Sequence, residues 1–170
     1  KGFKTVPYCP RCGTPLSSQE VAQGYKTVKE RSAIVRFQVV GEDAYFLAWT
    51  TTPWTLPSNV ALCVNPDETY VKVKAADGYT YYLAEALLDK VLGGLADEEK
   101  GAAAYEVLET YKGTDLERKE YEPLFPFADK LIEKQHKKAY FVTCDTYVTM
   151  TDGTGIVHIA SAFGEDDAKV

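Results

Sequence analysis

Short strand-type runs, many of them closed by a turn signal, constrain the fold of this chain most. One apolar run ends at Gly41-Glu42-Asp43, and a run that alternates between polar and apolar side chains ends at Asp77-Gly78. Alternation closed by such a turn is typical of β-hairpins. We therefore expect strands over residues 33–40, 44–52, 69–75, 79–83, 105–111, 139–150 and 156–162.

The segments between these runs complete the fold class. The last two runs flank the turn at residues 151–155, which predicts a final hairpin. Leucine and valine at helical spacing predict a helix over residues 84–92, stopped by Gly93-Gly94. Residues 113–127 contain two prolines and predict a long loop. Many short strands with one or two helices favour an α+β class: a β-barrel-like domain with a few peripheral helices.

Length and composition favour one domain. The chain has 170 residues, 45% of them hydrophobic and 26% charged, so disordered and collagen-like classes are disfavoured. No apolar run approaches the roughly 20 residues of a membrane span. The net charge of −6 argues against nonspecific binding of nucleic acid, which depends on neutralising phosphates. Cys63 and Cys144 lie inside apolar runs, which favours a reducing compartment and a cytoplasmic location.

Two regions follow from this organisation. Residues 1–25 are turn-rich and carry Cys9-Pro10-Arg11-Cys12, so they predict a Cys-containing linker or knuckle. Residues 26–170 carry the main domain. The chain lacks an initiator Met and stops where a helix would begin, so we expect a segment of a much longer protein that is monomeric when isolated.

Residues 50–59 read Thr-Thr-Thr-Pro-Trp-Thr-Leu-Pro-Ser-Asn. Because proline fixes φ and lacks an N–H group, Pro53 and Pro57 cannot lie in a central strand. We expect the chain to leave its strand near Thr52 as a stiff loop lined with hydroxyl groups. Hydroxyls both donate and accept, which suits the positioning of a water or a ribose hydroxyl. The structural alternative is a threonine-rich strand end followed by an ordinary proline turn.

A second stretch, Gly153 to Asp167, carries one of the two histidines. His158 lies in an apolar strand-type run, so a satisfied core histidine is the alternative to a functional one. Asp167 follows Gly164 where a helix is expected to start, and helix capping is its alternative role.

Together the two stretches resemble the editing domain inserted in the class I aminoacyl-tRNA synthetases for isoleucine, valine and leucine. In that family a Thr-Thr-x-Pro-x-Thr motif and a Gly-Thr-Gly-x-x-His segment, followed by an Asp, line one pocket. Thr52 and Trp54 resemble the isoleucine enzymes, since the other two usually carry Arg and an acidic residue there. Residues 8–17 also match, so the resemblance covers nearly the whole chain. Ser161 departs from the family's Pro and is expected to loosen its loop.

The resemblance implies an aminoacyl-tRNA deacylase that removes valine from valyl-tRNA(Ile) and also acts on valyl-adenylate. Its partners would be the 3′ end of tRNA(Ile) and the rest of the synthetase, with no membrane. Editing itself would need no cofactor, and ATP would bind only in the synthetic domain, which is absent from this chain.

The resemblance also assigns roles. A hydroxyl cluster would surround the terminal ribose and ester, one residue would support that cluster, and a carboxylate would hold the α-ammonium group. A histidine would shape the pocket and an indole would form its wall. The implied catalytic residues are Thr50, Thr51, Thr52 and Asp167. The implied substrate-binding residues are His158, Asn59, Trp54 and Asp167.

Cys9 and Cys12 supply half of a zinc ligand set, because a structural zinc site normally has four ligands. The family pattern places their partners beyond this chain, so zinc is expected only in the full-length enzyme. A redox pair is the alternative, although no thioredoxin-like pattern surrounds the motif. We predict that the chain alone holds no stoichiometric zinc, and elemental analysis of the purified chain checks this.

Three other functions are compatible with the sequence. A zinc-knuckle β-barrel that binds nucleic acid without catalysis is opposed by the acidic charge and the incomplete ligand set. A catalytically silent insert is opposed by the presence of the threonines, His158 and Asp167. A valine or leucine editing domain is opposed by Thr52 and Trp54. The basic run at residues 130–138 is either a solvated face or a contact with the tRNA acceptor end.

Overall fold

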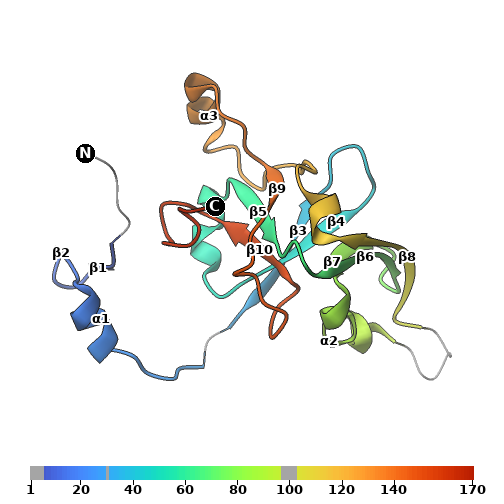
Figure 1. The fold of residues 1–170 in the computed structure, drawn as a ribbon, viewed down its shortest axis with the longest axis horizontal. Helices are drawn as coiled ribbons and strands as arrows, with labels where there is room; N and C mark the ends of the chain where they lie inside the picture. Colours follow the sequence, from blue (N-terminus) through green and yellow to red (C-terminus); the bar gives the residue numbers. More distant parts are fainter. Residues whose placement is uncertain (1–5, 30, 97–102) are drawn as a thin grey trace.

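The computed structural model describes residues 6–29, 31–96 and 103–170, and it forms a mixed β-sheet curled into a half-barrel (Figure 1). The sheet runs in the order β8-β6-β7-β4-β10-β5-β9, and β3 pairs with the free edge of β4. Its strands are β3 (Ala33–Gln38), β4 (Tyr45–Thr50), β5 (Ala61–Val64), β6 (Thr69–Ala75), β7 (Thr80–Ala84), β8 (Tyr105–Lys112), β9 (Phe141–Cys144) and β10 (Ile156–Ile159). The β-barrel-like α+β class predicted from the sequence is confirmed.

Helical elements are short and peripheral. They are α1 (Ser18–Gln23), η1 (Pro53–Ser58), η2 (Glu85–Leu87), α2 (Leu88–Leu92), η3 (Gly93–Leu95), η4 (Gly113–Leu116) and α3 (Asp129–Gln135), where η marks a 3-10 helix. A small hairpin of β1 (Tyr8–Cys9) and β2 (Thr14–Pro15) precedes α1, and both stand apart from the sheet in Figure 1. Among the described residues, none of these helices has the length and apolar character needed to cross a bilayer.

Strand β4 is the centre of the sheet. It pairs antiparallel with β3, and its other edge is shared by two parallel strands, β7 near its start and β10 near its end. Both edges of β4 are therefore paired, and its consecutive buried residues Phe46, Leu47 and Ala48 show that both of its faces are covered as well. The largest fully buried side chains around it are Tyr70, Tyr82, Tyr121, Phe37, Phe46, Leu62, Leu83, Leu116 and Ile156. This core fixes the point at which the threonine run leaves the sheet.

The predicted final hairpin is wrong. Strands β9 and β10 do not pair with each other, because both pair with β5, which lies between them. β5 aligns antiparallel with β10 and parallel with β9, and its Leu62 and Val64 are fully buried. Burying β5 between two partners satisfies both of its hydrogen-bonding edges, which a local hairpin would not do.

Three further expectations need correction. The helix expected over residues 84–92 is divided into the 3-10 helix η2 and the α-helix α2. Ala84 belongs to β7 and donates its N–H to the Thr154 carbonyl, 2.9 Å away. The stiff loop expected after Thr52 is instead the 3-10 helix η1, with proline in its first turn. The C-terminal segment forms successive turns and no regular helix starts near Gly164. Helices α1 and α3 were not predicted.

Glu42, in the β3–β4 turn, is bonded to β6, to β7 and to the loop after η4. Its carboxylate accepts hydrogen bonds from Lys72 and Tyr82, at 2.9 and 2.7 Å, and from Lys119. Burial alone raises the pKa of Glu42, but the bonds from Lys119, Tyr82 and Lys72 outweigh it and lower that pKa to about 2.

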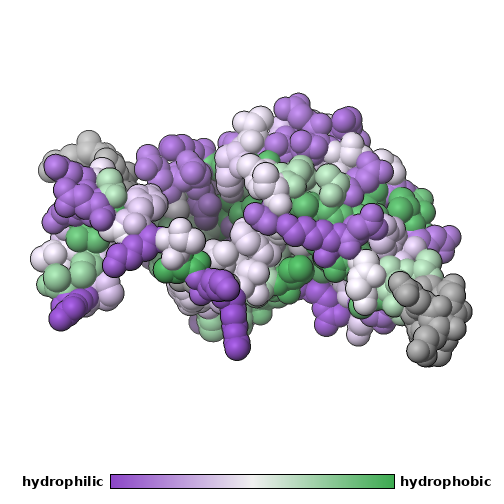
Figure 2. Space-filling view, turned by 90° about the horizontal axis from the view of Figure 1, so that it is seen from below, coloured by the Kyte–Doolittle hydropathy of each residue, from purple (hydrophilic) through white to green (hydrophobic). Residues whose placement is uncertain are grey.

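Hydrophilic side chains cover much of one face of the domain, with apolar patches between them (Figure 2).

The Glu42 network predicts a pH-dependent stability. The carboxylate stabilises the fold above its ordinary pKa of 4.5, and that contribution is lost as the pH falls towards about 2. We expect Glu42→Gln to lower the free energy of unfolding at pH 7 and to differ little from the parent chain near pH 2. Urea unfolding across this pH range measures the difference. The exposed neighbour Asp43, changed to Asn, is the matched control; an equal effect there would contradict the assignment.

Candidate active site

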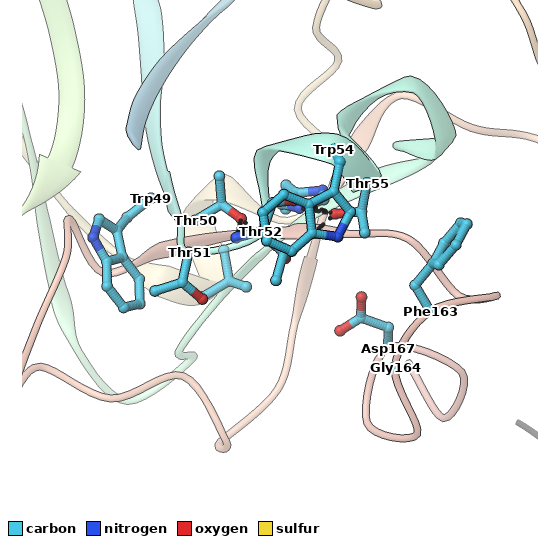
Figure 3. A pocket seen from close by; sticks show the side chains of 11 residues that line it. Trp49, Thr50, Thr51, Thr52, Trp54, Thr55, Phe163, Gly164 and Asp167 are labelled. Carbon is cyan, nitrogen blue, oxygen red and sulfur yellow. Dashed lines mark hydrogen bonds between the residues drawn. The ribbon is translucent and has the colours of Figure 1, made fainter. Parts of the chain in front are cut away.

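The end of β4, the start of η1, β10 and the C-terminal loop surround one cavity of about 350 Å³ (Figure 3). The residues that line it are Trp49, Thr50, Thr51, Thr52, Trp54, Thr55, Val157, His158, Phe163, Gly164 and Asp167. All of the residues implied by the resemblance line it except Asn59. The parallel pairing of β10 with β4 brings the two sequence stretches together, since Val157 is the register partner of Trp49.

The three threonines differ in environment. Thr50 is buried, and its hydroxyl accepts the N–H of Thr52 at 3.0 Å. Thr52 is half-buried, and its hydroxyl lies 3.4 Å from that of Thr50, whereas Thr51 is exposed on the cavity side. The hydroxyl of Thr50 thus closes the turn out of β4, as a side-chain turn does. The hydroxyl groups of Thr51 and Thr52 remain available to a ligand.

A residue outside the predicted set fixes the histidine. The hydroxyl of Thr55 donates to the Thr52 carbonyl at 2.8 Å, so it must accept from His158 Nε2, which lies 3.0 Å away. This assigns the proton of the neutral imidazole to Nε2. Thr55 is the last residue of the Thr-Thr-x-Pro-x-Thr motif, and this position was the sequence signal that could have identified it as a site residue.

Burial holds His158 neutral. It lowers the pKa of the imidazole, and the negative charge of Asp167 opposes that shift only in part. Nδ1 is buried and has no hydrogen-bond partner within the described residues. His158 therefore lines the cavity with Nε2 hydrogen-bonded to Thr55 and with Nδ1 buried.

Asp167 lies across the cavity from the threonines, on the C-terminal loop (Figure 3). Its Oδ2 accepts the backbone N–H of Ala160 at 2.9 Å, which ties the loop to the end of β10. A methyl group on Gly164 would come within 3.0 Å of the Asp167 Cγ, so the glycine gives the carboxyl group room. Asp167 therefore caps this loop and not a helix, and it is the carboxylate that faces the cavity.

Two predicted residues lie at the margins. Asn59 is buried behind the cavity, where its amide donates to the Ala61 carbonyl at 2.8 Å and accepts from the Tyr121 hydroxyl at 2.5 Å. It joins the end of η1 to β5. Trp54 lies on the cavity rim with 70% of its surface exposed. Phe163, on the C-terminal loop, is a second exposed aromatic residue of the lining that the sequence analysis did not single out.

Cys9 and Cys12 lie at the β1–β2 hairpin, far along the chain from this cavity. The Cys12 N–H donates to the Cys9 sulfur at 3.4 Å, and hydrogen bonds from the Cys12 backbone lower the pKa of the Cys9 thiol. This geometry fits two ligands of a zinc site. Across residues 6–29, 31–96 and 103–170, no group of three or more candidate ligands comes together.

Comparison with solved structures identifies the fold. The cytosolic leucyl-tRNA synthetase editing domain of P. knowlesi matches with a TM-score of 0.59 and 17% identity, over 81% of this chain and 59% of that chain. The equivalent domain of P. falciparum matches with a TM-score of 0.56 and 20% identity, over 74% of this chain and 43% of that chain. No family model matches the sequence. The chain has the fold of the editing domains of class I aminoacyl-tRNA synthetases.

Curated relatives give the family. The chain is 53% identical to the isoleucine–tRNA ligase of Clostridium kluyveri over 168 residues, which is 99% of this chain. It is 55% identical to the Clostridium acetobutylicum ligase over 98% of its length, and 48% identical to that of Picrophilus torridus over 100%. The chain belongs to the isoleucine–tRNA ligase family, and it spans 15% of the length of these relatives.

Proposed function

We propose that this chain hydrolyses the ester bond of valyl-tRNA(Ile), and also valyl-adenylate, as the editing site of a cytoplasmic isoleucyl-tRNA synthetase. The observation that carries the proposal is the single cavity that collects Thr51, Thr52, His158 and Asp167 in a relative of isoleucine–tRNA ligases. The 3′ end of the tRNA is the partner that would deliver the ester. Zinc, held through Cys9 and Cys12 with ligands from elsewhere, would be structural and not part of hydrolysis.

A size filter explains why such a site is needed. Isoleucine and valine differ by one methylene group, which one binding pocket discriminates by only about 1–3 kcal/mol, a limit for which isoleucine–tRNA ligases are themselves the standard illustration. A second site that admits valine and excludes isoleucine supplies the remaining selectivity. In this proposal the buried, neutral His158 and the rim residue Trp54 form the walls that set the admitted size.

The reaction needs a positioned water and an anchored substrate. Water attacks the ester carbonyl, the bond from that carbon to the ribose oxygen breaks, and the proton from water ends on the released ribose hydroxyl. Hydroxyl groups of Thr51 and Thr52, with those of the substrate ribose, would orient the water. Asp167 would hold the α-ammonium group through a charge-assisted hydrogen bond. No strong nucleophile is required, because an aminoacyl ester is already activated.

Deacylation of valyl-tRNA(Ile) and isoleucyl-tRNA(Ile), first by this chain and then by a synthetase containing it, tests the proposal. We expect rapid loss of valine and retention of isoleucine. Equal inertness toward both esters in the synthetase would contradict it and would favour a silent insert. Equal loss of both would retain hydrolysis but refute the size filter.

A further inference from the structure

Helix α3 projects from the body of the domain with an unusual surface (Figure 1). Residues 129–138, which are α3 and the residues that follow it, carry four lysines against two acidic residues: Lys130, Lys134, Lys137 and Lys138 against Asp129 and Glu133. All four lysines are exposed, in a chain whose net charge is −6. Within the part of the chain that the structure describes, none of them forms a salt bridge. We call residues 129–138 the arm. It is a local cationic surface on an acidic protein.

The lysines of α3 affect its stability in both directions, because Lys134 in the last turn complements the helix dipole. However, Lys130 and Lys134 are four residues apart, so they face each other one turn apart on α3, where like charges repel by a few tenths of a kcal/mol. The arm is anchored at its base, where the Tyr140 hydroxyl donates to Asp129 at 2.8 Å. The lysines are therefore free to serve a ligand.

Two aromatic residues precede the lysines in the sequence. Phe125 and Phe127, just before α3, stack with ring centroids 5.5 Å apart and planes 4° from parallel. Phe127 is 71% exposed and Phe125 is 39% exposed, so the stacked pair presents aromatic surface to the solvent. Exposed aromatic faces next to lysines are the combination by which proteins hold unstacked nucleic-acid bases and their phosphates.

A second cavity, of about 310 Å³, is shared by the segment after α3 and the C-terminal loop. Its lining includes Lys138, Arg118, Phe141, Thr143 and Asp167, together with apolar side chains of β5 and β10. The Arg118 guanidinium stacks over the Phe141 ring, 4.7 Å from its centroid, and its nearest acidic group, Glu117, is 4.0 Å away. Asp167 lines both this second cavity and the candidate active-site cavity.

We propose that α3, the stacked phenylalanines and the cavity at Arg118 and Lys138 form an RNA-contact surface that guides the acceptor end of tRNA to the candidate active site. The inference rests on the proposed function for the identity of the RNA. The cavity favours RNA over an anionic membrane, because Lys138 and Arg118 share this concave site with Asp167 of the candidate active site, and a flat lipid surface cannot enter it. The aromatic pair would contact unpaired bases, and the lysines would contact phosphates.

Direct binding of an RNA hairpin with the sequence of the tRNA(Ile) acceptor stem and a single-stranded CCA end tests the surface. We expect the double variant Lys134→Ala/Lys137→Ala of this chain to weaken binding on the order of tenfold at about 50 mM salt, and to reduce the slope of log affinity against log salt by about 2. The matched control is Lys74→Ala/Lys112→Ala, which removes two exposed lysines from β6 and β8 and should change affinity less than about twofold.

Three outcomes would overturn this surface: no RNA binding by the parent chain, equal loss of affinity in both double variants, or lysine-dependent binding only to vesicles of anionic phospholipid. Because the measurement is binding, it is independent of hydrolysis. Lysine-dependent binding without valyl-ester hydrolysis would retain the surface and refute the proposed function. Hydrolysis of valyl-tRNA(Ile) with RNA affinity unchanged in Lys134→Ala/Lys137→Ala would retain the proposed function and refute the RNA-contact surface.

Discussion

Replacing Asp167 with alanine is expected to abolish deacylation of valyl-tRNA(Ile) while the domain stays folded. Asp167 is the carboxylate that faces the cavity, and it lies opposite the hydroxyl cluster that would position water. Removing one partner of a charge-assisted hydrogen bond that the bound substrate covers costs about 2–5 kcal/mol, which corresponds to a loss in kcat/KM of roughly 30-fold to 5000-fold. Single-turnover deacylation measures it, and circular dichroism checks the fold.

The neighbouring Asp166 provides the matched control. It is exposed, pairs with Lys169 at 3.1 Å and does not line the cavity, so Asp166→Ala should retain deacylation. Asp167→Asn separates the two functions of the side chain, because its amide oxygen can still accept the Ala160 N–H while the charge is lost. We expect Asn to be as inactive as Ala. Unchanged hydrolysis in Asp167→Ala would end the assignment, and equal loss in Asp166→Ala would point to the loop as a whole.

Local pairing could be predicted from the sequence, and non-local pairing could not. The β6–β7 hairpin was predicted from the turn at Asp77-Gly78, and a turn was predicted at residues 41–43, where β3 and β4 pair. Strands β9 and β10 are also neighbours, yet β5 separates them, and no local signal encodes that choice. The pairing of β9 and β10 with β5 depends on which strand edges remain unpaired once β4 and β5 are buried. This is a property of the whole sheet.

The site shows the same limit. The motifs in residues 50–59 and 153–167 predicted which residues line the cavity, because the family resemblance links two stretches far apart in the sequence. Spacing alone could not show that Thr55 bonds to His158, since the two residues are separated by 103 positions. It also could not show that Asn59 is buried behind the cavity against Tyr121. Side-chain direction at the end of a strand depends on the local turn, here the unpredicted η1.

Gly155→Ala is expected to be the most destabilising single-methyl change near the site. Gly155 has φ of +74°, a left-handed conformation that costs other residues roughly 1–2 kcal/mol. An added Cβ would also come within 2.3 Å of the Ala84 Cβ, where β7 approaches the turn before β10. Overpacking a tight contact adds about 1–3 kcal/mol, so the free energy of unfolding should fall by about 2–5 kcal/mol. Urea unfolding of the two chains measures this difference.

Gly41 separates the two causes. Its φ of +75° matches that of Gly155, but nothing lies within 4 Å of the position of an added Cβ. Gly41→Ala should therefore lose only the roughly 1–2 kcal/mol of the left-handed backbone. The additional loss in Gly155→Ala then measures the close approach of β7 to the turn that starts β10. Because His158 follows Gly155 by three residues on β10, a displaced turn should also shift the cavity wall and impair valine selectivity in the folded fraction. Equal losses in the two variants would show that this close approach can relax, and would contradict a role for it in placing the turn before β10.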